Sequence, residues 1–281
     1  MFPPSPTRAD RVAATSSPAS VVLFLNPHPG PRRPELEARR PPIDTDNPRC
    51  WDIFFEIHTG LPREAPGDPV SAGRALALVP DLGEEPRVLD LGCGPGAATT
   101  LLAGSTGGHV VAVDLHAPFL GEVRDKAARE GVSSRVLPVH TSMEALPFRP
   151  GSFDLVWSEG ALYNVGFGRG LDVSREVLKP GGALAATEAV WLTPDPPAEA
   201  PAWWEAEYPG ITGIGANIRI IEESGFGLLG HFTLPARAWW GYYRPIEERL
   251  ATLRERHGRD PVALEVIDDA QIEIDMYRRF S

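Results

Sequence analysis

The sequence has few of the residues that cross-link or metallate small proteins. Only two of its 281 residues are cysteines, Cys50 and Cys93. Two thiols cannot form a multi-disulfide scaffold or a four-cysteine zinc site. So few cysteines are typical of a protein from a reducing compartment. We therefore expect a cytoplasmic protein that holds no metal and depends on a hydrophobic core.

Long apolar runs and an excess of basic charge are also missing. The apolar run near the start, Val21–Leu25, is too short for a membrane-spanning helix or a secretory signal. Lys and Arg number 27 against 38 Asp and Glu, a net charge of −11. An acidic chain is a poor binder of phosphate backbones. We expect no membrane or nucleic-acid partner, and a monomer or homodimer that acts on a small molecule.

Proline is abundant but unevenly placed. Of the 30 prolines, 11 fall in residues 1–48, a segment with a net charge of +1, which leaves −12 for residues 49–281. This composition predicts a disordered leader over 1–48 and a folded domain over 49–281. The alternative is that Val21–Leu25 docks on that domain as a strand.

From residue 49 onward, apolar runs alternate with amphipathic stretches. The pattern predicts six strands, at 87–91, 110–114, 135–140, 153–157, 183–187 and 226–234. The helices expected among them are 68–79, 97–103, 118–130, 170–179 and 214–224. Continuous apolar strands that alternate with helices are typical of an α/β protein with a doubly wound, mainly parallel sheet.

Two segments stand apart from this alternation. The sheet core is expected over residues 85–234, and the Pro- and Trp-rich insert 188–212 interrupts it after the fifth strand. We expect the insert to act as a lid or pocket wall. Helical patterns with mixed Arg and Glu fill 245–280, which is typical of a helix with a solvated face.

A glycine-rich loop joins the first expected strand to its helix. Its glycines, Gly92, Gly94 and Gly96, allow a sharp turn and a close approach of the backbone to a ligand. The helix that follows offers free N–H groups to an anion. Asp90 precedes the loop, and Asp114 ends the next strand, where an acid can accept hydrogen bonds from ribose hydroxyls. A carboxylate at Asp90 suits a cationic amino group better than a pyrophosphate.

These motifs, taken in order, resemble a known family. The chain is similar to class I S-adenosylmethionine-dependent methyltransferases, in the group that contains the ubiquinone and menaquinone C-methyltransferases. The matching segments are VLDLGCGPG at 88–96, VVAVDL at 110–115, MEALPF at 143–148, FDLV at 153–156 and LKPGG at 178–182. A narrower resemblance, over most of 50–280, is to a bacterial subgroup without a settled substrate.

The resemblance implies S-adenosylmethionine as the cofactor and a role for each matching position. The loop Gly92–Gly96, with Cys93 inside it, would border the methionine moiety, and Asp90 would lie near its amino group. Asp114, followed by Leu115, would hold the ribose diol. The positions implied beside the adenine are Ser142 and Met143, and Ser158 would lie where cofactor and substrate meet.

The methyl acceptor's side of the site is less clearly marked. Glu159 follows a buried strand and could act as a general base or as an ammonium ligand; it could equally be a helix-capping acid. His58 and Tyr163 are further candidates for catalysis, although each could simply pack. The residues expected to line the substrate pocket, with core packing as the alternative, are Asn164, Trp191, Trp203 and Trp204.

One departure from the family bears on the fold. Its sheet usually ends with an antiparallel strand at the C-terminus, and no strand-like run follows the helical patterns of 245–280. We therefore expect an incomplete sheet with unpaired strand edges, unless Val21–Leu25 fills the gap.

The expected reaction is in-line methyl transfer from the sulfonium of S-adenosylmethionine to a small molecule. Alignment of the two reactants can contribute several kcal/mol, so the reaction needs no catalytic triad. Three alternatives remain open: a non-catalytic cofactor-binding protein, a nicotinamide-dependent oxidoreductase and an aminopropyltransferase.

Overall fold

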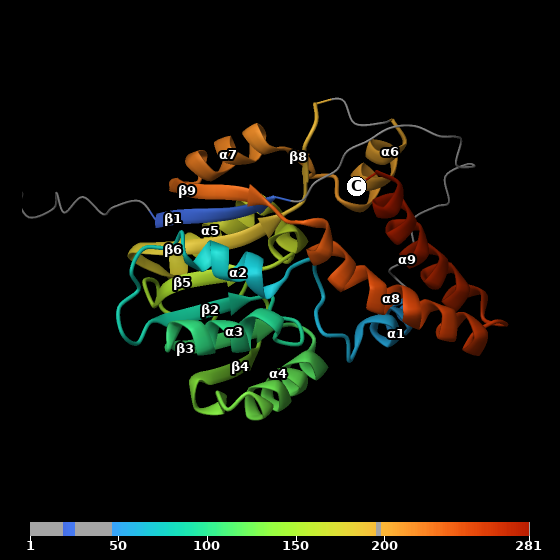
Figure 1. Ribbon diagram of the computed structural model, residues 1–281, viewed down its shortest axis with the longest axis horizontal. Coiled ribbons are helices and arrows are strands. Elements are labelled where there is room, and N and C mark those ends of the chain that lie inside the picture. The colour runs from blue at the N-terminus through green and yellow to red at the C-terminus, as the bar shows by residue number, and fades with distance from the viewer. Residues whose placement is uncertain (1–18, 26–46, 195–197, 281) are drawn as a thin grey trace, which may run out of the picture.

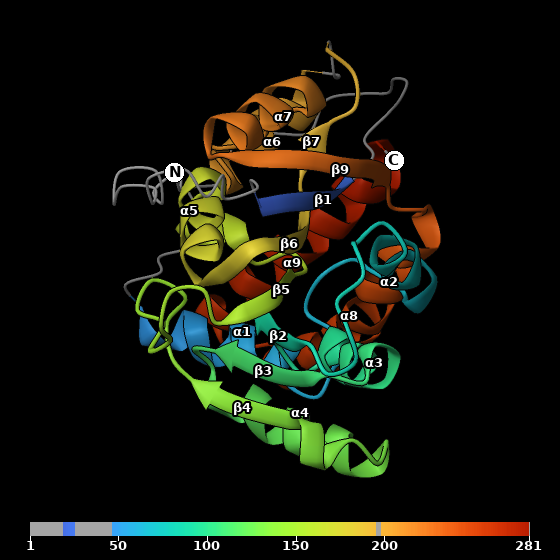
Figure 2. The same cartoon turned by 90° about the vertical axis from the view of Figure 1, so that its left-hand side faces the viewer.

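The computed structural model describes residues 19–25, 47–194 and 198–280. A seven-stranded sheet with the order β4-β3-β2-β5-β6-β1-β9 forms its centre, and every strand pair in this described part is parallel (Figure 2). The doubly wound α/β fold is confirmed. None of the helices in the described ranges is long and apolar enough to cross a membrane.

The strands of the main sheet follow the expected apolar runs closely. They are β1 (Ala19–Leu25), β2 (Arg87–Leu91), β3 (His109–Asp114), β4 (Val136–His140), β5 (Phe153–Ser158), β6 (Leu178–Glu188) and β9 (Phe226–Thr233). A small second sheet pairs β7 (Val190–Trp191) with β8 (Thr212–Gly213).

Most of the helices also lie close to their expected positions, whereas α1 and α6 were not expected. They are α1 (Pro48–His58), α2 (Pro69–Leu76), α3 (Ala97–Thr106), α4 (Ala117–Arg129), α5 (Phe167–Val177), α6 (Glu199–Glu207), α7 (Ile214–Glu223), α8 (Ala236–Arg256) and α9 (Pro261–Phe280). Two 3₁₀ turns, η2 (Ser133–Arg135) and η3 (Leu162–Val165), complete the set.

Local chemistry accounts for where these helices begin and end. Asp68 caps α2 by accepting hydrogen bonds from the N–H groups of Val70 and Ser71, which satisfies donors that have no partner inside the helix. Gly131 follows α4 with a φ of +70°, a left-handed conformation that glycine adopts without a Cβ clash.

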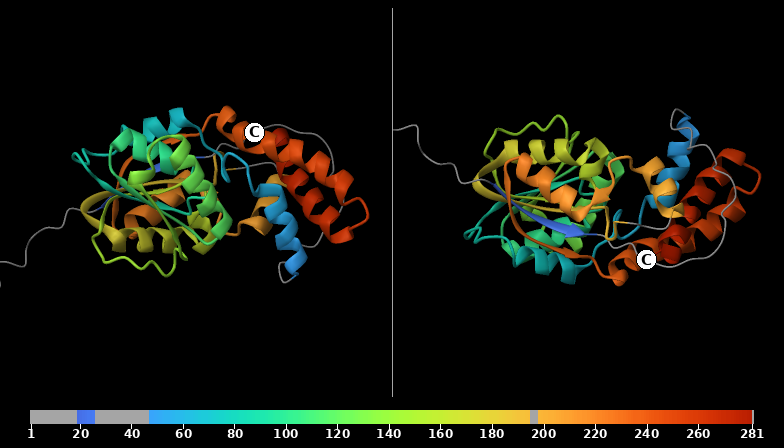
Figure 3. Two further views of the ribbon diagram at one scale, coloured as in Figure 1. Left: turned by 90° about the horizontal axis from the view of Figure 1, so that it is seen from below. Right: turned by 90° about the horizontal axis from the view of Figure 1, so that it is seen from above.

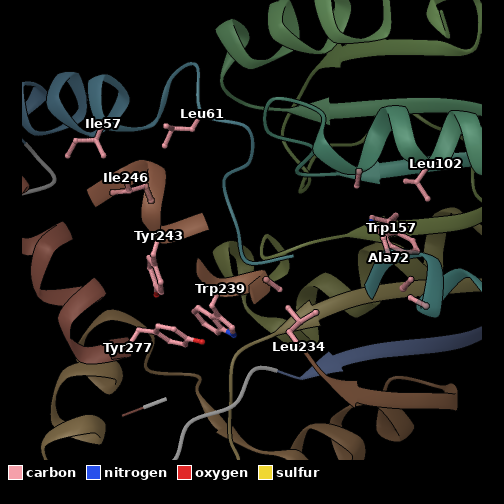
Figure 4. Packing of buried hydrophobic residues seen from close by; sticks show 14 of the residues in the cluster. Ile57, Leu61, Ala72, Leu102, Trp157, Leu234, Trp239, Tyr243, Ile246 and Tyr277 are labelled. Atoms are coloured by element: carbon pink, nitrogen blue, oxygen red, sulfur yellow. The ribbon is translucent and has the colours of Figure 1, made fainter. Parts of the chain in front are cut away.

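Two layers of apolar side chains cover the two faces of the sheet. On one face, Ala72 of α2 and Leu102 of α3 pack with Leu155 and Trp157 of β5 (Figure 4). On the other face, residues of α5 and α7 pack with strand residues that include Leu89, Leu91, Val111 and Val113. Both layers consist of fully or nearly fully buried residues, so the hydrophobic effect fixes the sheet between its helices.

The N-terminal segment corrects one expectation. The prediction that 1–48 is a disordered leader is wrong for residues 19–25, because they form β1 in the interior of the sheet. β1 pairs with β6 on one side and with β9 on the other (Figure 1). Apart from the start of α1, the rest of the expected leader lies outside the described residues.

β1 also answers the expected gap in the sheet. The unpaired strand edges expected from the missing C-terminal strand are not observed between β6 and β9, because β1 hydrogen-bonds to both. The proline-rich composition of residues 1–48 predicted disorder. It carries no information about β6 and β9, whose backbone groups pair with β1 from far away in the sequence.

The C-terminal helices form a second packing unit. α8 and α9 contact each other and α1, and they lie beyond the carboxyl ends of the strands (Figures 1 and 3). Trp239 stacks on Tyr277 with ring centroids 4.6 Å apart, and both residues are buried. The helical pattern expected for 245–280 is therefore confirmed, and α8 begins earlier, at Ala236.

Candidate functional site

The glycine-rich loop and both expected aspartates meet at one end of the sheet. β2 and β3 are adjacent and parallel, so Asp90 and Asp114, at or near their carboxyl ends, lie on the same side of the molecule. The backbone N–H of Gly94 donates to Asp114 Oδ2 at 2.8 Å, and that of His116 donates to Asp114 Oδ1 at 2.8 Å. The loop and the acid thus form one rigid cradle.

The loop glycines are required by its geometry. Gly92 has a φ of +73°, and a Cβ at this position would lie 2.4 Å from the Cβ of Ala161. Gly96, with a φ of +84°, precedes the first turn of α3. A side chain at Gly92 would push the loop away from η3 and close the space that the cradle leaves for a ligand.

Asp90 is the most deeply buried acid of the cradle. The residue is 1% exposed, and Oδ2 accepts a hydrogen bond from the Thr99 hydroxyl at 2.5 Å. Burial raises the pKa of Asp90 to about 7, the nearby carboxylates of Glu159 and Asp114 add to this, and the Thr99 hydrogen bond opposes it. A cationic group bound beside Asp90 would offset that unfavourable burial.

A cleft opens beside the loop, and its walls carry groups of opposite charge. Asp90, Gly92 and Gly94 line it together with Arg63 and Glu159. The Arg63 guanidinium contacts Glu159 Oε2 at 3.5 Å. Trp157 Nε1 donates to Glu159 Oε1 at 3.0 Å. Burial raises the pKa of Glu159, although the Arg63 charge opposes this.

The sequence analysis did not identify Arg63 or Glu64 as site residues. Both lie in the turn-rich segment between α1 and α2, where no periodicity marks a function. The only available signal was a pair of charges within a short run rich in Pro and Gly. Glu64 also lines the cleft, and its Oε2 lies 2.6 Å from His58 Nδ1. Burial raises the pKa of Glu64, and His58 opposes this.

His58 lies behind the cleft wall. Its ring is buried, stacks on Phe54 with centroids 4.3 Å apart and reaches the cleft through Glu64. Cys93 is buried in the loop, and burial raises the pKa of its thiol well above the usual value. An uncharged thiol is a poor nucleophile, so Cys93 has the character of a small packing residue.

Met143, Ser142 and Ser158 are the residues expected at the adenine and at the end of the fourth expected strand. The side chain of Met143 lies beside Gly92, and Ser142 Oγ accepts a hydrogen bond from the N–H of Glu144 at 3.1 Å. Ser158 is fully buried and donates to the carbonyl of Leu91 at 2.8 Å. Ser158 therefore ties β5 to β2 directly below the loop.

Leu115, in contrast, is 67% exposed next to Asp114. An apolar side chain left in solvent at the mouth of the cradle is available to cover a bound ligand. The contribution of Leu115 to cofactor binding stays a prediction.

The catalytic candidate Tyr163 and the expected substrate-pocket residues divide into two groups. Tyr163 and Asn164 lie on η3; the Asn164 amide donates to the carbonyl of Ala161 at 3.0 Å, and the Tyr163 ring lies 5.6 Å from that of Tyr208. Trp191 and Trp203 instead pack against a buried cluster that α6 and α9 form. Trp204 packs edge-on against Trp203.

Comparison with known proteins agrees with this geometry. Residues 88–182 match the family model described as "Methyltransferase domain". The matched residues include Asp90, the Gly92–Gly96 loop and Asp114, so the cradle lies within the part of the chain that is similar to a methyltransferase domain.

Individual relatives match the core alone. Demethylmenaquinone methyltransferase of Clavibacter sepedonicus is 42% identical over 113 residues, which cover 40% of this chain and 44% of the relative. Glycine/sarcosine/dimethylglycine N-methyltransferase of Actinopolyspora halophila is 31% identical over 138 residues, 47% of this chain and 24% of the relative. The chain thus spans less than half the length of these curated relatives.

A solved structure supports the fold over a longer range. A methyltransferase of Geobacter sulfurreducens, solved in complex with S-adenosyl-L-homocysteine, aligns with a TM-score of 0.65 at 20% identity. The alignment covers 81% of this chain and 91% of the other. At this identity the likeness shows the shared fold.

Proposed function

We propose that the protein transfers a methyl group from S-adenosylmethionine to a small-molecule acceptor. The observation that carries this proposal is the cradle, in which the Gly92–Gly96 loop, buried Asp90 and Asp114 meet at the carboxyl ends of β2 and β3. The donor set fits the cofactor, because Asp114 can accept from ribose hydroxyls and Asp90 suits an amino group. Bound there, the cofactor supplies an electrophilic methyl group on a sulfonium.

Arg63 extends the cradle to the carboxylate of a methionine moiety. Its side chain is 14% exposed, and its contact with Glu159 is long, at 3.5 Å. A guanidinium can pair with a carboxylate through two parallel hydrogen bonds. Arg63 would bind that carboxylate while Asp90 faces the amino group, so the two ends of the zwitterion meet opposite charges.

Glu159 is the candidate base or positioning acid of this site. It lies at the end of β5, lines the same cleft as the loop, and is held by Trp157 and Arg63. Burial raises the pKa of Glu159 above the ordinary value of a glutamate, which makes its carboxylate a stronger proton acceptor. His58 lies behind Glu64 and would act on the site through that carboxyl.

Calorimetry with S-adenosylmethionine and S-adenosylhomocysteine tests the proposal. The wild type should bind both, Asp114→Ala should weaken binding at least tenfold, and Asp81→Ala, whose carboxylate only accepts from the N–H of Gly83, should not. Binding by the wild type that Asp114→Ala leaves unchanged would contradict the assignment to Asp114; no binding by folded wild type would contradict the function.

A labelled-methyl assay on metabolite extracts, with Glu159→Gln as the variant, then tests the role of Glu159. We expect turnover to fall while cofactor affinity changes little. Full turnover in Glu159→Gln would leave Glu159 as a structural residue.

A further inference from the structure

A second buried carboxylate, outside the cofactor cradle, has an oxygen without a partner. Glu188, the last residue of β6, is 2% exposed. Its Oε1 accepts a hydrogen bond from the Tyr208 hydroxyl, and its Oε2 is buried with no hydrogen-bond partner among the described residues. A buried carboxylate oxygen without a donor raises the free energy of the folded protein. A ligand that donates a hydrogen bond to Oε2 would remove this cost.

Glu188 lies next to the reaction end of the sheet. The preceding residue, Thr187, accepts a hydrogen bond at Oγ1 from the N–H of Gly160 at 2.6 Å. Gly160 in turn follows Glu159, which lines the cofactor cleft. The free oxygen therefore belongs to the part of the molecule where an acceptor must approach the methyl donor.

Tyrosine rings stand beside this carboxylate. The rings of Tyr208 and Tyr163 are 5.6 Å apart at an angle of 58°. Tyr163 is 45% exposed, yet its hydroxyl pKa is raised to about 12, first by burial and then by the nearby charges of Glu273 and Glu188. Tyr163 thus presents an exposed aromatic ring near the Glu188 charge.

The surroundings of Glu188 and Tyr163 are acidic. Burial raises the pKa of Glu273, whose Oε1 accepts from the Tyr243 hydroxyl at 2.8 Å. Burial raises the pKa of Tyr242, and the charges of Glu273, Glu64 and Tyr163 raise it further. These three groups therefore lie near the Tyr242 hydroxyl. Among the described residues, no Arg or Lys forms an ion pair with Glu188 or Glu273. A positively charged ligand would meet negative charge and aromatic faces here.

We propose that the methyl acceptor bears an amino group that is protonated when it binds, and that this ammonium donates to Glu188 Oε2 beside the rings of Tyr163 and Tyr208. This inference rests on the proposed methyl transfer and names the substrate class. The ammonium replaces the missing donor of Glu188, and the tyrosine faces stabilise its charge by cation–π contact.

The binding of three benzyl compounds tests the inference. Benzylammonium, benzyltrimethylammonium and neutral benzyl alcohol are titrated by calorimetry into the full-length protein, with and without saturating S-adenosylhomocysteine. We expect benzylammonium to bind at least tenfold more tightly than benzyl alcohol. The preference should shrink to about twofold or less in Glu188→Gln, because the neutral amide keeps the shape but loses the charge.

A matched variant separates this effect from general damage. Glu205→Gln, at an exposed position of α6, should keep the full preference. If Glu188→Gln fails to fold, as judged by its S-adenosylhomocysteine affinity, the wild-type comparison still decides.

The outcomes are distinct from those of the functional test. Equal affinity of the wild type for benzylammonium and benzyl alcohol would overturn this inference, as would an unchanged preference in folded Glu188→Gln. If S-adenosylhomocysteine still binds in those cases, the proposed function stands and only the substrate class fails. If S-adenosylhomocysteine does not bind, the proposed function fails, and the titrations without it still report whether a cation site exists.

Discussion

At the residue scale, the site consists of charges buried against one another. Asp90, Glu159 and Arg63 line one cleft, and burial raises the pKa of both acids. Such perturbed groups at one end of a sheet are typical of functional sites. The protein holds them in place with fixed donors, Thr99 for Asp90 and Trp157 for Glu159.

Arg63→Gln should weaken binding of S-adenosylhomocysteine by about tenfold or more. A charge-assisted hydrogen bond contributes about 1.5–3 kcal/mol, and about 1.4 kcal/mol is a tenfold change in affinity. Calorimetry measures the effect, and Arg237→Gln is the matched control, because Arg237 is exposed and contacts only the helix-capping Asp68. Equal affinities of wild type and Arg63→Gln would remove Arg63 from the cofactor site.

Asp90 gives a prediction for stability against pH. Its pKa is raised from 3.8 to about 7 in the folded state, so between pH 4 and 7 the folded protein binds a proton that the unfolded chain has released. The free energy of unfolding should then fall as pH rises, by about 1.4 kcal/mol per pH unit for one such group. Glu188, with a pKa raised to about 7 by burial, contributes in the same direction.

Urea unfolding of the ligand-free protein at pH 5 and pH 7 tests this dependence. The wild type should lose stability between the two values, and Asp90→Asn should lose clearly less, because its side chain does not titrate. Identical losses in the two proteins would show that Asp90 is ionised throughout.

At the scale of single elements, helix α2 depends on its cap. The Asp68 carboxylate accepts from two backbone N–H groups and from the Ser71 hydroxyl at 2.7 Å. Burial tends to raise its pKa, but the hydrogen bonds from Ser71 and the Arg237 charge lower it overall. The cap therefore stabilises the fold above the ordinary pKa of an aspartate and loses its effect as pH falls through the lowered value.

Asp68→Ala should lower the free energy of unfolding at pH 7 by about 1 kcal/mol, the usual effect of removing such a cap. Chemical denaturation measures it. Asp81→Ala, which removes an acid from a loop near the end of α2, should change stability by less than half of that. A loss of the same size in both variants would assign the effect to general charge rather than to capping.

At the scale of the whole molecule, the sheet joins segments far apart in the sequence. β1 lies between β6 and β9 and hydrogen-bonds to both, whereas these two strands do not pair with each other. Without it, β6 and β9 would each present a row of free backbone groups, which invites aggregation.

Leu23→Pro tests this arrangement through the backbone. Proline removes an N–H from an interior strand whose residue 23 is registered with Ala186 and His231. A buried acceptor that loses its donor costs about 1–3 kcal/mol. Thermal unfolding should shift to lower temperature, with increased aggregation, while Leu23→Ile should behave as the wild type. Wild-type stability of Leu23→Pro would show that residues 19–25 do not belong to the sheet in solution.

The sequence by itself determined the α/β core and the cofactor cradle. Both are local, because each strand and helix has its own periodicity. Asp90, the loop glycines and Asp114 all lie within one strand–helix–strand unit. Such features depend on neighbours a few residues away, so they can be read without knowing the fold.

Only the tertiary structure decided the place of β1, the entry of Arg63 and Glu64 into the cleft, and the free oxygen of Glu188 beside Tyr163. Each depends on partners far away in the sequence: β6 and β9 for β1, Glu159 for Arg63, and the tyrosines of η3 and of the end of α6 for Glu188. Burial and hydrogen-bond satisfaction are properties of the packed chain, and no local pattern records them.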